Sequence, residues 1–296
     1  MGGGGYKKSR VSVSKNISLS DEPDLFVYKE IIPLIRKVDR YQIDMELGIR
    51  SKVIHFYPYT PNKKIIFFHK GHGSDYAARL PFVKAMLKDG YEVIEFSMPL
   101  KGINKQRDLV VFSKGVGPLR VRNHDDFFQL YLEKGIPLKF FITPVVVMLG
   151  IMPENVPIYM IGISGGGWTT LLAAALEPRI QKSVSIAGAW PSYMTSHLMK
   201  RNGDYEMVTP DFYKYINYPE LMIMGAAGYN RKQLLIYNER DPCCFAGYYS
   251  NIFIEPLKRK LSSLEKTGKI DLYIDGHHNE HTISDASIEI IQKFIK

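Results

Sequence analysis

Residues 156–169 read VPIYMIGISGGGWT, and this stretch decides the predicted fold. Its first half is a continuous apolar run, which is typical of a strand covered on both faces of a parallel sheet. Its second half leads into small and apolar residues that predict a helix packed behind the sheet. Between the halves, Gly162-Ile163-Ser164-Gly165-Gly166 matches the pattern G-x-S-x-G. In a sharp strand-to-helix turn this pattern projects its serine above the sheet, so the sequence predicts Ser164 as a nucleophile.

Similar apolar runs lie on both sides of this stretch. They cover residues 64–69, 91–97, 180–187, 233–237 and 270–274, and a run at 53–57 predicts an additional antiparallel edge strand. Helical patterns cover residues 77–88, 166–176, 251–266 and 284–296. This alternation predicts an α/β fold, a doubly wound and mostly parallel sheet flanked by helices. The loops that follow the strands then meet at one edge, where ligands bind.

Two long segments interrupt the alternation. Residues 100–155 and 190–231 follow strands, so we expect helical insertions that form a rim or lid at the ligand edge. Within the first, His124-Asp125-Asp126 is expected to begin a helix, because acidic residues suit the N-terminal end of its dipole. Residues 1–20 are predicted to be a disordered tail. Residues 21–296 are predicted to form a single domain.

A glycine-rich loop, His69-Lys70-Gly71-His72-Gly73-Ser74, follows the strand at 64–69. Such a loop can turn backbone N–H groups towards the nucleophile and complete an oxyanion hole. We expect Gly165, directly after the nucleophile, to give one donor. The second donor is expected from Gly71 or His72, with Lys70 as a further candidate.

An acid and a base are expected in the loops after the last two strands. Asp241 lies in LLIYNERDPCC, where its carboxylate can hold an imidazole in the required tautomer; Glu239 is the rival. The base is expected among His277, His278 and His281, which follow the last strand. We favour His281, because it leads directly into the final helix, and keep His278 as the alternative base.

The same three histidines are also candidate metal ligands. Their spacing suits a helix, but Gly276 and Asn279 indicate a loop. The motif H-E-x-x-H is absent, and the two cysteines, Cys243 and Cys244, have no partnered spacing. No metal is therefore expected in the site. Since adjacent cysteines rarely meet disulfide geometry, no disulfide is expected either.

The formal net charge of +9 is concentrated in two segments. Residues 1–20 carry +4 and residues 101–123 carry +5, so the rest of the chain is balanced. This distribution argues against a nucleic-acid partner. The N-terminus lacks the apolar run of a signal peptide, and the longest apolar stretch, 140–152, is too short to span a bilayer. We expect a soluble, cytoplasmic protein; the sequence does not predict its oligomeric state.

Over residues 50–296 the chain resembles the α/β-hydrolase superfamily. The resemblance rests on the loop at 69–73, the turn GISGG, the late Asp241 and the final histidine loop, in the family's order. It implies Ser164 as nucleophile, His281 as general base and Asp241 as the acid of a triad. One departure is the oxyanion loop, which reads His-Lys-Gly-His-Gly here, whereas lipases and esterases often have His-Gly-Gly-Gly.

The resemblance implies a serine hydrolase that cleaves an ester through an acyl-enzyme intermediate, without a cofactor. The layout is similar to esterases and deacetylases that act on small or carbohydrate esters. A serine peptidase of the prolyl-peptidase type is the first alternative, although 296 residues leave no room for its large additional domain. A non-catalytic binding protein with the same fold is the second.

Overall fold

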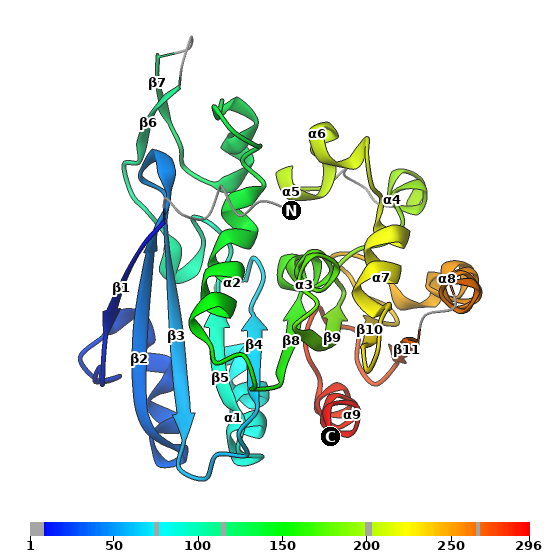
Figure 1. Ribbon diagram of the computed structural model, residues 1–296, viewed down its shortest axis with the longest axis horizontal. Helices are drawn as coiled ribbons and strands as arrows, with labels where there is room; N and C mark the ends of the chain where they lie inside the picture. Colours follow the sequence, from blue (N-terminus) through cyan, green and yellow to red (C-terminus); the bar gives the residue numbers. More distant parts are fainter. Residues whose placement is uncertain (1–8, 74–76, 114–116, 199–202, 265–266) are drawn as a thin grey trace.

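The computed structural model describes residues 9–73, 77–113, 117–198, 203–264 and 267–296. Over these residues the main sheet has nine strands in the order β1-β2-β3-β5-β4-β8-β9-β10-β11 (Figure 1). The strands are β1 (Arg10–Ser14), β2 (Ile35–Asp44), β3 (Arg50–Pro58), β4 (Ile65–His69), β5 (Glu92–Phe96), β8 (Ile158–Ile163), β9 (Ile180–Ile186), β10 (Lys232–Asn238) and β11 (Lys269–Asp275).

Six strands, from β5 to β11 in the sheet order, are parallel to one another. All six correspond to the apolar runs that the sequence predicted as parallel strands. Parallel strands end at the same edge of a sheet, so the loops after β4, β8, β10 and β11 lie at one edge. These loops carry the predicted nucleophile, oxyanion donors, acid and base.

The antiparallel end of the sheet differs from the prediction. β3 pairs antiparallel with β5, as expected, but it is an internal strand, because β2 covers its other side. β1 pairs antiparallel with β2 and forms the edge. The structure therefore differs from the predicted disorder of residues 1–20 at Arg10–Ser14, while residues 1–8 lie outside the described part of the chain.

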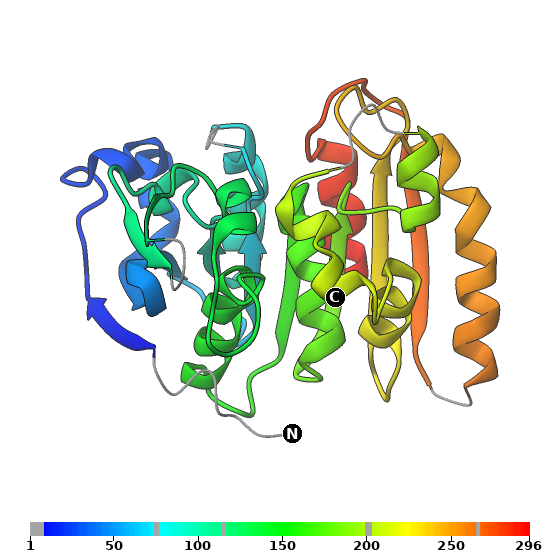
Figure 2. The same cartoon turned by 90° about the horizontal axis from the view of Figure 1, so that it is seen from above.

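Helices cover both faces of the sheet (Figures 1 and 2). On one face, α2 (Lys139–Ile151), α3 (Gly165–Leu176), α7 (Tyr218–Ala226) and α8 (Asn251–Ser263) share one apolar core with the sheet. On the other, η2 (Pro23–Leu34), α1 (Leu80–Lys88) and α9 (Asp285–Ile295) share a second core. The predicted doubly wound, mostly parallel sheet flanked by helices is confirmed.

The remaining elements are short. They are η3 (Glu46–Gly48), η4 (Ala77–Arg79), η5 (Gly102–Asn104), η6 (His124–Gln129), η7 (Gly247–Tyr249), α4 (Ser192–Leu198), α5 (Tyr205–Val208), α6 (Pro210–Tyr213) and the hairpin β6 (Val110–Ser113)–β7 (Gly117–Arg120). η6 begins at His124, where a helix start was predicted. A capping box formed by Asn123 and Asp126 satisfies the first N–H groups of η6 and fixes its start.

The two interrupting segments supply more than short surface elements. α2 comes from the segment 100–155 and α7 from 190–231, and both contact α3. The segments also carry η6 and α5, which contact each other. In the described residues, no helix has the length and apolar composition needed to cross a membrane.

Candidate active site

Ser164 lies at the turn between β8 and α3, with φ 59° and ψ −131°. This backbone region costs a non-glycine residue on the order of 1–3 kcal/mol, and such strain occurs mainly where the fold enforces it. The N–H of Ser164 donates to the carbonyl of Ile186 in the neighbouring strand, 2.9 Å away, which anchors the turn. The serine itself is half-buried.

Backbone atoms lie so close to the glycines around Ser164 that a side chain would not fit there. A Cβ on Gly162 would lie 2.2 Å from the carbonyl oxygen of Gly166. A Cβ on Gly166 would lie 2.1 Å from the carbonyl oxygen of His69. Neither distance is possible for real atoms, so any side chain at these positions would displace the nucleophile turn or the adjoining loop.

The loop after β4 packs directly against the nucleophile turn. Gly71 has φ 75°, and a Cβ there would lie 2.3 Å from the carbonyl oxygen of Ile163 and 3.1 Å from the Cβ of Ser164. A Cβ on Gly165 would in turn lie 2.5 Å from the ring of His72. The structure thus brings Gly71, His72 and Gly165 together around Ser164.

The three candidate donors of the loop differ in what their N–H groups already bind. The N–H of Lys70 donates to the carbonyl of Phe96 at 3.1 Å, and that of Gly71 donates to Nδ1 of His69 at 3.2 Å. Burial lowers the pKa of His69 to about 3, so its ring is neutral and can accept. The N–H of His72 has no acceptor among the described residues. Of the three, His72 is therefore the donor best placed to serve a ligand.

The side chain of Lys70 has a structural role that the sequence did not indicate. Its ammonium group is buried and forms an ion pair with the buried Glu95, at 2.6 Å. The hydroxyl of the buried Tyr28 donates to the other oxygen of Glu95. This cluster ties the start of the loop after β4 to β5 and η2.

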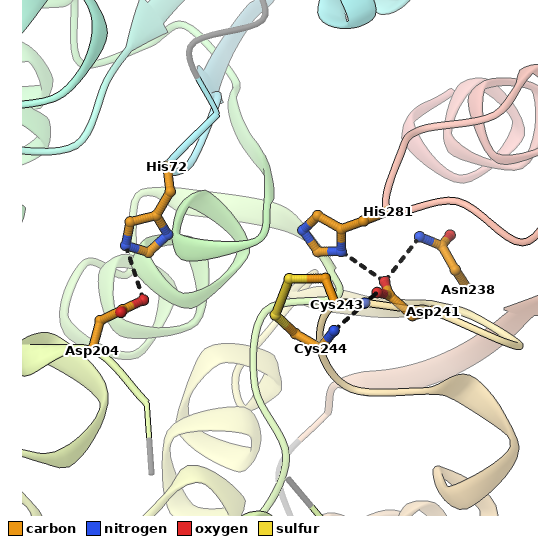
Figure 3. The surroundings of a disulfide bond; sticks show 7 residues. All are labelled: His72, Asp204, Asn238, Asp241, Cys243, Cys244 and His281. Carbon is orange, nitrogen blue, oxygen red and sulfur yellow. Dashed lines mark hydrogen bonds and ion pairs between the residues drawn. A yellow bond between two sulfur atoms is a disulfide. The ribbon is translucent and has the colours of Figure 1, made fainter. Parts of the chain in front are cut away.

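In the loops after β10 and β11, the ring of His281 binds Asp241 (Figure 3). Nδ1 of His281 lies 2.7 Å from Oδ2 of Asp241. The N–H groups of Cys243 and Cys244 donate to Oδ1, each at 2.9 Å. Burial alone would raise the pKa of Asp241, but His281 and the two N–H groups outweigh it and hold the pKa below its usual value.

In the neutral imidazole, the hydrogen bond to the Asp241 carboxylate places the ring proton on Nδ1 of His281 and leaves the lone pair on Nε2. This nitrogen is buried and has no hydrogen-bond partner among the described residues. It therefore makes no hydrogen bond to Ser164 in this structure.

The rival residues are engaged elsewhere. Nδ1 of His277 lies 3.0 Å from Asp275, and Nε2 of His278 faces the same carboxyl group at 3.4 Å. Glu239 is more than one-third exposed and pairs with Arg240. In the described residues, neither rival histidine contacts Asp241.

The cysteines next to Asp241 differ from the expectation. Cys243 and Cys244 form a disulfide, although none was expected between adjacent residues (Figure 3). The turn after Asp241 is tight, since the N–H groups of both cysteines converge on one carboxylate oxygen. This turn brings the two sulfur atoms together beside the acid.

Solved structures with a similar fold include three esterases. The chain is 17% identical to acetyl xylan esterase 1 from Thermoanaerobacterium sp., with a TM-score of 0.56 and coverage of 97% of this chain and 87% of that one. It is 12% identical to a glucuronoyl esterase from Solibacter usitatus, with a TM-score of 0.62 and coverage of 97% and 85%. It is 15% identical to an esterase from Pyrococcus furiosus, with a TM-score of 0.57 and coverage of 90% and 92%.

No protein-family model and no curated protein sequence matches the chain. At these identities the likeness to the three esterases concerns the fold. The sheet order, the helices on both faces and the strand-to-helix turn at Ser164 agree with it. The chain has the α/β-hydrolase fold.

Proposed function

We propose that the protein is a serine hydrolase that cleaves carboxylic esters, with Ser164 as nucleophile, His281 as base and Asp241 as acid. The observation that carries the proposal is the state of the His281 ring. One nitrogen is held by an ionised carboxylate at 2.7 Å, and the other is buried with no partner. A general base needs this combination: a fixed tautomer and a free lone pair.

In the proposed reaction, Nε2 of His281 takes the proton of the Ser164 hydroxyl, and Oγ attacks the ester carbonyl. The N–H groups of Gly165 and His72 hold the oxyanion. The alcohol leaves with the proton from His281, and water then releases the acyl group through the same base. Ser164 and His281 make no hydrogen bond in this structure, so the pair must draw together when substrate binds, as is common in structures without ligand.

For the substrate, we propose an acyl ester carried by a carbohydrate. Two of the structural neighbours are named as an acetyl xylan esterase and a glucuronoyl esterase, which points to sugar esters as the first class to test. The alternatives from the sequence, a prolyl peptidase and a non-catalytic binding protein, have no specific observation in their favour.

The test is labelling with a fluorescent fluorophosphonate, which reacts with an activated serine. The wild type should be labelled and Ser164→Ala should not. Ser97→Ala is the matched control, because Ser97 also directly follows a parallel strand at the same edge. It should be labelled like the wild type.

Unlabelled wild-type protein would then be given acetylated xylooligosaccharides, a p-nitrophenyl acetate ester and a prolyl amide. Turnover of the esters and not of the amide supports the proposal. A folded wild type that is neither labelled nor active on any of these substrates would overturn it.

A further inference from the structure

Three side chains from distant parts of the sequence converge on one point beside the oxyanion loop. They are His72 from the loop after β4, His124 from the first turn of η6, and Glu206 from α5. Nε2 of His72 lies 3.2 Å from Nε2 of His124 and 3.0 Å from Oε1 of Glu206. Nε2 of His124 lies 3.7 Å from Oε2 of Glu206. His124 and Glu206 are almost fully buried.

A proton on His72 can satisfy only part of this cluster. Nδ1 of His124 lies 3.1 Å from the carbonyl oxygen of Pro99, so a neutral His124 carries its proton there and presents a lone pair at Nε2. Apart from the two histidines, neither oxygen of Glu206 has a hydrogen-bond donor in the described residues. A single proton on Nε2 of His72 would face the ring of His124 and the carboxylate of Glu206 together, and it can be directed at only one.

The same atoms have the spacing of a metal site. Zinc binds imidazole nitrogen and carboxylate oxygen at about 2.0–2.2 Å, so ligand atoms in a tetrahedral site lie about 3.4 Å apart. The three separations here, 3.2, 3.0 and 3.7 Å, lie on both sides of that value. Two imidazoles and one carboxylate also form a donor set that zinc accepts, with a fourth position left for water.

The surrounding residues hold two of the three side chains in place. The Pro99 carbonyl fixes the ring of His124, which is the usual arrangement for a histidine that binds metal. The hydroxyl of Tyr213 donates to the backbone carbonyl of Glu206 at 2.7 Å, and Trp168 donates to that hydroxyl from α3. The N–H of Tyr205 donates to Asp125 at 3.0 Å, which joins the start of α5 to η6.

We propose that His72, His124 and Glu206 bind a divalent transition-metal ion, Zn²⁺ in the first place. The opposite edge of the His72 ring faces Gly165, because a Cβ there would lie 2.6 Å from Nδ1. The ion therefore lies on the side of His72 away from the nucleophile turn. Its role is to fix the oxyanion loop, η6 and α5 to one another, and it takes no direct part in acyl transfer.

No pattern in the sequence indicates this site, since its three residues are separated by 52 and 82 positions. Asp204 lies close by, with Oδ2 at 3.4 Å from Nε2 of His72 (Figure 3). We place it beside the three ligands and not among them, because at this place in the described residues the donor atoms that all lie within 4.8 Å of one another are those of His72, His124 and Glu206.

The test uses the full chain, freed of metal with a chelator, and titrates it with Co²⁺ and with Zn²⁺. Tetrahedral Co²⁺ bound by nitrogen and oxygen ligands absorbs visible light, and Zn²⁺ should displace it. We expect one ion per chain and a rise in Tm when Zn²⁺ is added. Glu206→Gln should weaken Zn²⁺ binding by more than about tenfold, and His124→Gln should do the same.

The matched control is Glu92→Gln. Glu92 also pairs with a buried histidine, since its carboxylate lies 2.8 Å from Nε2 of His55, but it is not part of the cluster. This variant should bind Co²⁺ like the wild type. Ser164→Ala should as well, which separates the metal site from the proposed catalysis. A folded wild type that binds neither ion, or binding that Glu206→Gln leaves unchanged, would overturn the proposal.

Discussion

Two aspartate–histidine clusters lie at the ends of β10 and β11, one around Asp241 and one around Asp275, and only one of them suits catalysis. Asp241 binds one histidine, His281, and two backbone N–H groups. Asp275 binds His277 through both its N–H and its ring, and accepts hydroxyl donors from α9 and its cap. Both carboxylates are buried and both have a lowered pKa.

The difference is in the second nitrogen of each imidazole. His281 has a buried Nε2 without a partner, whereas the His277 side chain is 69% exposed, which leaves it in water. His278 uses Nδ1 to accept the N–H of Glu280 and turns Nε2 towards Asp275. A carboxylate–imidazole pair is therefore weak evidence for a catalytic base. His278 also has a buried Nε2 without a hydrogen-bond partner, but its Nδ1 accepts from Glu280, so a neutral ring carries its proton on Nε2. The informative feature is therefore a buried nitrogen whose lone pair is free.

The largest expected effect separates the histidines. His281→Ala should lower kcat for ester hydrolysis by on the order of 10⁶-fold, because it removes the base that activates the serine. His277→Ala and His278→Ala should stay within about tenfold of the wild type, since their rings do not contact Asp241. Steady-state kinetics on an ester, with circular dichroism to verify folding, measures this. An inactive His278→Ala beside an active His281→Ala would reverse the assignment of the base.

The second expected effect separates the carboxylates. Asp241→Asn should lower kcat by about 10⁴-fold, because the amide favours the wrong tautomer of His281. Asp275→Asn should leave kcat nearly unchanged and instead destabilise the fold by about 1–3 kcal/mol, since buried hydroxyl and N–H donors lose an ionised acceptor. Kinetics and urea unfolding on the same preparations distinguish the two. Equal losses of kcat would show that both clusters act on the base.

A third prediction concerns acid stability. Burial alone would raise the pKa of Asp275, but Ser284, Ser287 and His277 lower it to about 2, from 3.8 in an unfolded chain. A carboxyl group with a lowered folded-state pKa stabilises the fold above about pH 4 and loses that contribution as the pH falls towards 2. The wild type should therefore lose about 2 kcal/mol more than Asp275→Asn across this interval. Parallel pH profiles of the two proteins would contradict this.

The smallest expected effect concerns the disulfide beside Asp241. Replacing Cys243 and Cys244 with serine keeps both backbone N–H groups, which are the atoms that bind the carboxylate. The double variant should therefore retain kcat within about tenfold of the wild type, as should the wild type in a reducing buffer. A larger fall would show that the sulfur bridge, and not the N–H groups alone, orients the acid.

The sequence was sufficient for the parallel half of the fold. Strands such as β4 (IIFFH) and β8 (IYMIGI) are nearly continuous apolar runs, and such runs are easily seen. β2 was missed because charged and apolar residues alternate in IRKVDRYQID, and β1 because it lies in a short polar segment. Strands of this kind acquire their identity from the neighbours with which they pair, which a local pattern does not contain.

The site could be predicted where chain order and turn chemistry carry the information. Ser164, Asp241 and His281 each follow a predicted strand, so their common edge followed from topology. The topology did not predict which acceptor each backbone N–H group binds. The structure was needed to distinguish His72 from Lys70 and Gly71 as a donor. The cluster of His72, His124 and Glu206 had no signal, because its members meet only when three loops fold together.

The backbone angles of Ser164 lower the stability of the fold at a position where the proposed reaction requires a serine. At φ 59° and ψ −131°, a serine is strained by on the order of 1–3 kcal/mol, and glycine is not. Glycine would also make the unfolded chain freer, which offsets only about 1 kcal/mol of that relief. A library of variants sorted by melting temperature alone would therefore enrich Ser164→Gly and discard the hydroxyl. Under selection for heat resistance, the reactive serine persists only while its reaction is also required.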